Sequence, residues 1–199
     1  MNFGALRVLN DDRVEAGKGF GIHPHKNMEI ISIPLKGKLK HGDSNKNSRT
    51  ITIGDIQTMS AGTGIYHSEM NGSDTEPVEF LQIWVMPEKL NTPPAYQDYD
   101  IRPFLRKNEL ALIVSPDGDA PAKMLQQTWF SIGEIEAGKK IGYHMHQSHA
   151  GVYIFVIEGE VKVDDTVLSR RDGMGVYDTH SFELETLKDS HILLMEVPM

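Results

Sequence analysis

Short apolar runs bounded by turn-forming residues dominate this chain, and that pattern limits its fold more than any other feature. Glycine, asparagine, aspartate and proline stand between the runs, as they do between strands. No segment keeps a helical period of apolar residues over three turns, although a short helix is expected near residues 87–90. The pattern predicts an all-β sandwich or barrel, with strands in residues 29–35, 50–53, 78–85, 111–115, 128–135, 151–157 and 191–197.

The composition narrows the chemistry. The chain has 199 residues, with 28 acidic side chains against 20 basic ones, nine histidines and no cysteine. The acidic excess argues against binding driven by nucleic-acid phosphates. Without cysteine, disulfides, thiolate nucleophiles, iron–sulfur clusters and cysteine-based zinc sites are excluded. Any metal ion must therefore be held by imidazole nitrogen and by oxygen.

The sequence shows no targeting or membrane signal. Residues 1–12 lack the apolar core of a secretory signal peptide. Elsewhere, no apolar run reaches the roughly 18 residues that a spanning helix needs. We therefore expect a cytoplasmic protein without a membrane segment.

Residues 90–103 interrupt the strand pattern with three prolines and several asparagine and aspartate residues. Proline favours extended backbone at the residue before it, so this stretch is predicted to be an extended connector. We place a domain boundary at its end. The prediction is an N-terminal domain with its connector over residues 1–103 and a C-terminal domain over residues 104–199.

The two halves resemble each other. A glycine stands six residues before a His-x-His pair in each half, the pairs beginning at His23 and His144. The offset is 121 residues there and falls to 113 between His67 and His180. Two copies of one β unit, the second with shorter loops, explain this drift.

The first histidine group is the candidate metal site. His23 and His25 are two residues apart, so on a strand both project from one face, and His67 and Glu69 repeat this spacing. If the two strands face each other inside a barrel, all four side chains converge. Three imidazoles and a carboxylate suit Fe, Mn, Ni, Cu or Zn rather than Mg or Ca. An octahedral ion so held keeps two positions open for water, substrate or O₂.

Other polar and aromatic residues have weaker assignments. Glu29 lies four residues past His25, so strand parity places it on the same face, as a second-shell or substrate contact. Trp84 either stacks on a flat aromatic substrate or is a buried strand tryptophan. The second group, His144 and His146 with His149 and His180, lacks a matching carboxylate. It is interpreted as a degenerate copy without metal.

Longer motifs add a family resemblance. The glycine, His-x-His and Glu29 pattern, followed by Gly37, Gly54-Asp55 and His67, resembles the two cupin motifs, and its duplication resembles a bicupin. Over residues 123–199 the match is looser and rests on Glu158-Gly-Glu160 and Asp172-Gly173. The longest matches resemble the pirin family, and they lie in residues 3–12, 19–30, 41–44, 54–57, 61–69 and 81–85.

The resemblance implies two tandem cupin barrels, of the double-stranded β-helix or jelly-roll type, stacked face to face. It also implies one mononuclear metal, usually iron, in the N-terminal barrel, with the family's ligands falling on His23, His25, His67 and Glu69. The C-terminal cupin is then metal-free. His41 belongs to a family motif without an assigned role.

Two functions follow from this resemblance. Some pirins are quercetin 2,3-dioxygenases, which open a flavonol ring with O₂ and release carbon monoxide; Glu69 then serves as the base for flat aromatic alcohols. Alternatively, the chain is a non-catalytic iron or redox sensor that regulates a protein partner, either a transcription cofactor or a metabolic enzyme. Iron is the expected metal, with Ni, Cu, Mn and Zn as alternatives, and a monomer is expected.

Overall fold

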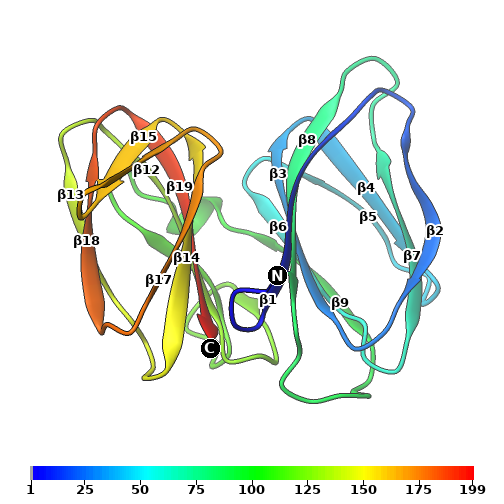
Figure 1. The fold of residues 1–199 in the computed structure, drawn as a ribbon. Coiled ribbons are helices and arrows are strands. Elements are labelled where there is room, and N and C mark those ends of the chain that lie inside the picture. Colours follow the sequence, from blue (N-terminus) through cyan, green and yellow to red (C-terminus); the bar gives the residue numbers. More distant parts are fainter. Residues whose placement is uncertain (1) are drawn as a thin grey trace. The chain divides into compact units, whose positions relative to one another are not determined.

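The computed structural model describes residues 2–199; Met1, the first residue of the predicted N-terminal domain, lies outside the described residues. Within that range the chain forms nineteen strands and one short 3-10 helix, η1 (Arg102–Phe104) (Figure 1). The all-β prediction is confirmed. Residues 87–90 form no helix and the chain bends over 88–90, so the helix predicted there is wrong; Asn91, with a φ of 56°, ends the stretch before a helical turn is complete. In the described chain, no helix is long and apolar enough to cross a membrane.

The chain divides into two compact units. The first consists chiefly of Leu6–Arg102, joined by Pro121–Gln126. The second consists of Pro103–Ala120 and Gln127–Met199, joined by Phe3–Ala5. Each unit thus takes a short segment from outside its main stretch of sequence.

The first unit contains two antiparallel sheets that lie opposite each other (Figure 1). One sheet has the strand order β1-β8-β3-β6-β9, and the other has the order β2-β7-β4-β5. Their bounds are β1 (Leu6–Val14), β2 (Gly19–His25), β3 (Glu29–Lys36), β4 (Lys38–Asp43), β5 (Ser48–Thr52), β6 (Asp55–Ser60), β7 (Ile65–Asn71), β8 (Val78–Val85) and β9 (Ala95–Asp100). The predicted connector therefore contains a strand, β9, which pairs with β6.

The second unit repeats this topology. Its strand neighbours β12-β19-β14-β17 follow the order of β1-β8-β3-β6, and β13-β18-β15-β16 follow that of β2-β7-β4-β5, so the predicted internal repeat is confirmed. The bounds are β10 (Ala111–Ser115), β11 (Ala122–Lys123), β12 (Trp129–Ile135), β13 (Lys140–His144), β14 (Ala150–Glu158), β15 (Glu160–Val163), β16 (Thr166–Ser169), β17 (Gly173–Tyr177), β18 (Ser181–Thr186) and β19 (Ser190–Pro198).

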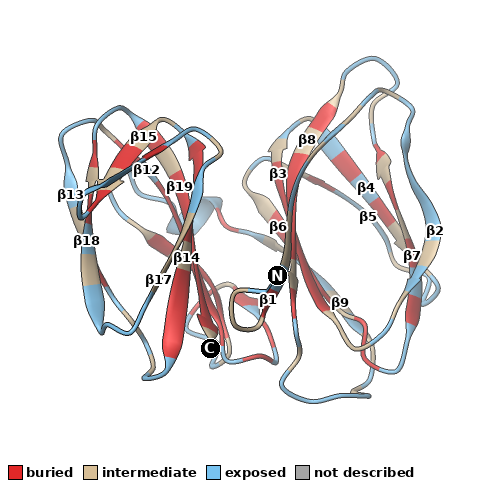
Figure 2. Cartoon of the chain, viewed as in Figure 1, coloured by how far each residue is buried: buried red, intermediate tan, exposed pale blue. Residues whose placement is uncertain are grey.

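The interior of the first unit has a polar layer between two apolar ones. Alternate residues of β8 share one face. On that face Phe80 packs with one apolar cluster and Trp84 with another, and Gln82 stands between them. Figure 2 shows buried positions along these strands. The polar layer consists of Ser32, His41, Gln57, Glu69 and Gln82, each at most 6% exposed. Buried polar groups need partners, so this layer indicates a site.

Candidate metal centre

Three histidines meet where β2 pairs with β7. His23 lies directly opposite His67 in the ladder. The ring centroids of His23, His25 and His67 are 4.4–4.9 Å apart, and their nitrogens lie within 4.8 Å of one another. The Nε2 atoms of His23 and His67 are only 3.0 Å apart. The structure therefore brings together the three histidines that the spacing singled out.

A bulge in β2 turns His23 and His25 into the barrel. Phe20 pairs with Glu69 but His23 pairs with His67, so β2 carries one residue more than β7 over this stretch. Such an extra residue re-aims the side chains that follow it. The carbonyl of Gly21, inside the bulge, accepts a hydrogen bond of 2.8 Å from His23 Nδ1. With its proton on Nδ1, neutral His23 presents an Nε2 lone pair to the cluster.

The other two imidazoles each have a buried nitrogen without a partner. Among residues 2–199, His25 Nε2 and His67 Nδ1 are buried and make no hydrogen bond. Burial lowers the pKa of His25 to about 4 and that of His67 to about 3, with the neighbouring histidines adding to the effect. Both rings are therefore neutral at pH 7, which is the form that binds metal ions. Buried polar atoms normally have a bonding partner. A metal ion would be such a partner for His25 Nε2, so this residue fits a metal site better than a purely packing role.

Glu69 lies two residues further along β7. Its Oε1 accepts a hydrogen bond of 3.0 Å from the Ser32 hydroxyl, and its Oε2 accepts one from the Gln82 amide. Burial raises the pKa of Glu69, although these hydrogen bonds act to lower it. Potential ligand atoms of Glu69, His41 and His67 form a second group within 4.8 Å of one another. Glu69 is therefore grouped with the histidine cluster through His67, which belongs to both groups.

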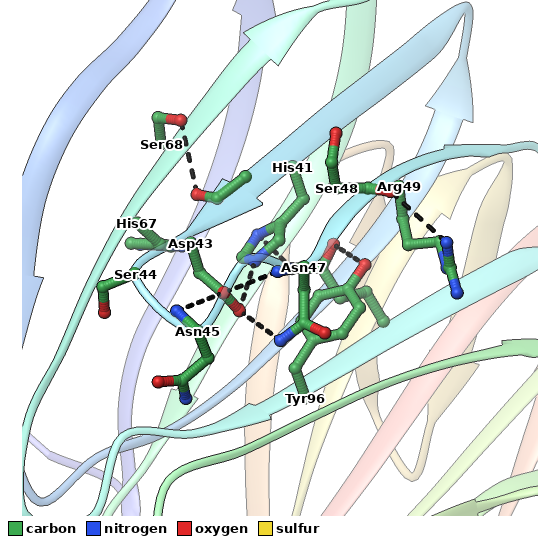
Figure 3. A network of polar contacts seen from close by, with 12 residues as sticks. His41, Asp43, Ser44, Asn45, Asn47, Ser48, Arg49, His67, Ser68 and Tyr96 are labelled. Carbon is green, nitrogen blue, oxygen red and sulfur yellow. Dashed lines mark hydrogen bonds and ion pairs between the residues drawn. The ribbon is translucent and has the colours of Figure 1, made fainter.

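His41 forms a wall of the site and has both ring nitrogens engaged. It pairs with Glu69 across β4 and β7. The Gln57 amide donates to His41 Nδ1 at 3.3 Å, so the ring proton is on Nε2, which faces Asp43 Oδ2 at 3.4 Å. The ring also stacks on Tyr96, with centroids 4.3 Å apart, as Figure 3 shows. These contacts make His41 a rigid neighbour of His67 rather than a free ligand.

Comparison with known proteins identifies the family. The model of the pirin family matches residues 1–85, and a model described as a quercetinase C-terminal cupin domain matches residues 112–197. A quercetin 2,3-dioxygenase of Escherichia coli strain K12 is 38% identical over 203 residues, which cover all of this chain and 84% of that protein. The chain belongs to the pirin family.

Solved pirin structures share the whole fold. YhhW of Escherichia coli matches with a TM-score of 0.93 at 38% identity, over all of this chain and 83% of that one. Bacterial pirin YhhW in complex with nickel(II) matches with a TM-score of 0.92 at 36% identity, over all of this chain and 84% of that one. The cupin architecture expected for both units is thereby confirmed.

Glu29 of this pirin has a structural role. Its carboxylate accepts hydrogen bonds from the Ser60 hydroxyl at 3.0 Å and from the backbone N–H groups of Leu125 at 2.9 Å and Gln126 at 2.7 Å. The parity argument that placed it beside the histidines fails because β2 ends at His25. The turn that follows, with Asn27 at a φ of 51°, breaks the alternation before β3 begins.

A Glu29→Ala variant is expected to lose about 2–6 kcal/mol of stability and to keep its metal affinity. The loss arises because two backbone donors remain without their acceptor, at about 1–3 kcal/mol each. Urea unfolding combined with metal titration measures both quantities. Glu88→Ala, at an exposed position, is the control and should stay within about 0.5 kcal/mol of the parent. Weakened metal binding at unchanged stability would instead restore the second-shell assignment of Glu29.

Trp84 lies beside the histidines. Its ring meets that of His25 edge-on, with centroids 4.8 Å apart at 85°. Its indole N–H donates to Gln82 Oε1 at 2.9 Å.

Sequence reasoning missed Gln82, Ser32 and the position of His41. A signal was available, because Ser32 and Gln82 are the polar residues that interrupt the apolar stretches over residues 30–35 and 80–85.

The second unit has an apolar interior where the first has its polar layer. Gly37 and Gly159 occupy matching turns before β4 and β15, each with positive φ. Counting from these turns and following the strand pairing gives the equivalent residues: Ile154 for Ser32, Val163 for His41, Phe182 for His67, Leu184 for Glu69 and Leu194 for Gln82. The sequence offset had paired His180 with His67. That pairing is wrong, because Phe182 is the counterpart of His67.

His144 and His146 are out of phase with the first pair. β13 pairs with β18 without a register shift, so Tyr143 rather than His144 takes the place of His23. His144 is exposed, and His146 Nδ1 bonds at 2.8 Å to the buried carboxylate of Glu196. His149 and His180 are exposed as well. A metal-free second unit stays a prediction, which these apolar replacements support.

Proposed function

We propose that this pirin binds one transition-metal ion through His23, His25, His67 and Glu69 and acts as an oxygenase of the quercetin 2,3-dioxygenase type. The observation that carries the proposal is the cluster of three imidazoles whose nitrogens lie within 4.8 Å of one another, with a buried, unpartnered nitrogen on His25. The relative named quercetin 2,3-dioxygenase and the nickel complex of YhhW support it.

The donor set fits such an ion. Nitrogen ligands lie about 2.0–2.1 Å from a bound transition metal, and two atoms 3.0 Å apart, such as Nε2 of His23 and of His67, can both reach one ion. Imidazole and carboxylate ligands suit Fe, Ni, Cu, Mn and Zn. Which of these ions the protein binds then depends on which is available. Iron is the ion we propose, with nickel as the alternative that the YhhW complex supports.

The protein supplies a base and the hydrogen bonds that hold it in place. When bound, the metal supplies Lewis-acid and oxygen-activating chemistry. Glu69 takes the proton from a substrate hydroxyl, because it is a buried carboxylate whose pKa is raised by burial. Ser32 and Gln82 hold its two oxygens in place during that transfer. Flat aromatic alcohols such as flavonols are the substrate class proposed.

The direct test loads the protein separately with Fe(II), Ni(II), Mn(II), Cu(II) and Zn(II), measures metal content, and follows O₂ uptake and carbon monoxide release with quercetin. We expect one ion per chain and equimolar O₂ uptake and carbon monoxide release with at least one metal. A fully loaded protein that leaves quercetin intact with every metal would overturn the oxygenase. Partner affinity that follows the oxidation state of iron would then favour the redox-sensing alternative.

A further inference from the structure

Two side chains of β8 link the proposed ligands to each other. Gln82 donates from its amide nitrogen to Glu69 Oε2 and accepts the indole N–H of Trp84 at its amide oxygen. Trp84 also packs edge-on against His25. The chain of contacts runs from a ligand on β2, through β8, to a ligand on β7.

The direction of this chain follows from the chemistry of its members. A glutamine amide can present either its NH₂ group or its oxygen to a neighbour, whereas an indole N–H only donates. Because Trp84 donates to the amide oxygen, the NH₂ group of Gln82 must face Glu69. If that donor is lost, the amide can turn its oxygen toward the carboxylate, and one Glu69 oxygen loses its partner inside a buried site.

The second unit offers an internal comparison. Leu184 stands where the first unit has Glu69, and Leu194 stands where it has Gln82. Both are fully buried. The glutamine is therefore absent from the repeat in which the carboxylate is absent, as expected if its task is to hold that carboxylate.

We propose that Gln82 is the positioning residue for Glu69 and that Trp84 acts through Gln82 to fix its amide. This inference rests on the proposed metal site and adds to it two residues that set the orientation of the fourth ligand. Loss of an outer partner of a ligand typically weakens metal binding about 10–100-fold.

The test measures nickel(II) affinity by chelator competition and the nickel d–d absorption spectrum in the full-length protein. Gln82→Leu is expected to weaken nickel binding about 10–100-fold and to shift the spectrum. Trp84→Phe keeps an aromatic ring against His25 but removes the N–H. It is expected to change the nickel affinity and the spectrum in the same direction as Gln82→Leu, but by a smaller amount. In the double variant, Trp84→Phe should add nothing to Gln82→Leu, because its effect passes through the amide.

Gln126→Leu is the matched control, since Gln126 is another buried glutamine of this unit, but its amide donates to the Met86 carbonyl outside the polar layer. It should leave the nickel spectrum unchanged. If Gln82→Leu does not fold, Gln82→Asn, which shortens the reach of the amide, takes its place. Additive effects of the two β8 substitutions, or an equal effect of Gln126→Leu, would overturn the positioning role while leaving the metal site intact. A parent protein that binds none of the five ions, iron, nickel, manganese, copper and zinc, would overturn the proposed function itself.

Discussion

A His23→Ala variant is expected to fold as the parent does and to bind iron or nickel at least about 100-fold more weakly. That bound follows because losing a ligand costs more than losing an outer partner, which already costs about 10–100-fold. His23 is partly exposed on β2, and its Nε2 lies 3.0 Å from that of His67, so the substitution removes a donor without opening the core. Metal content after dialysis and chelator competition measure the effect, and circular dichroism checks the fold.

His144→Ala is the matched control, because His144 begins the corresponding His-x-His pair but is exposed on β13. The variant should keep the full metal content and affinity of the parent. A drop in metal content with His144→Ala would show that the second unit binds an ion. Full metal content in His23→Ala would remove His23 from the ligand set.

The second large effect is expected from Glu69→Gln, which should lower quercetin turnover about 100- to 10,000-fold, the range that a positioned general base supplies. The amide has the shape of the carboxylate but cannot take a proton. It also sets an NH₂ group among the donors from Ser32 and Gln82, which disturbs the hydrogen bonds that now hold the side chain. Initial rates of O₂ uptake, normalised to bound metal, separate the lost base from weaker metal binding.

Glu196→Gln provides a comparison at a position of similar burial. Glu196 is fully buried in the second unit and bonds to Tyr143 and His146. Its loss should change stability and leave turnover per bound metal as in the parent. Unchanged turnover in Glu69→Gln would mean that another group takes the substrate proton.

Local patterns were sufficient to predict seven of the nineteen strands and the three histidines. The apolar run over residues 78–85 became β8 with the same bounds, because a buried strand needs little more than apolar side chains between turns. His23, His25 and His67 were predicted from spacing alone. Two-residue spacing keeps side chains on one face as long as the strand is continuous.

Long-range pairing decided what the sequence could not reveal. His41 is beside Glu69 only because β4 pairs with β7 in one particular register. Gln82 reaches Glu69 across the barrel interior, which no local pattern encodes. Glu29 was misplaced because parity was carried through a turn. From the sequence, His144 and His146 were treated as the equivalents of His23 and His25. This was wrong because the bulge in β2 is defined by its pairing with β7, which the sequence does not reveal.

The bulge in β2 also has a meaning for how the two repeats diverged. In the gene, it amounts to one codon between those for Phe20 and His23. Deleting that codon would give a regular ladder from Phe20 opposite Glu69 to His23 opposite His67, so the histidines would still face inward. In β13 the inward position opposite Phe182 is held by Tyr143, and an extra residue bulged out before Tyr143 would leave His144 opposite Ser181, facing outward. The two repeats therefore differ in the residues that stand at the paired inward positions, and no single-codon insertion or deletion would convert one into the other.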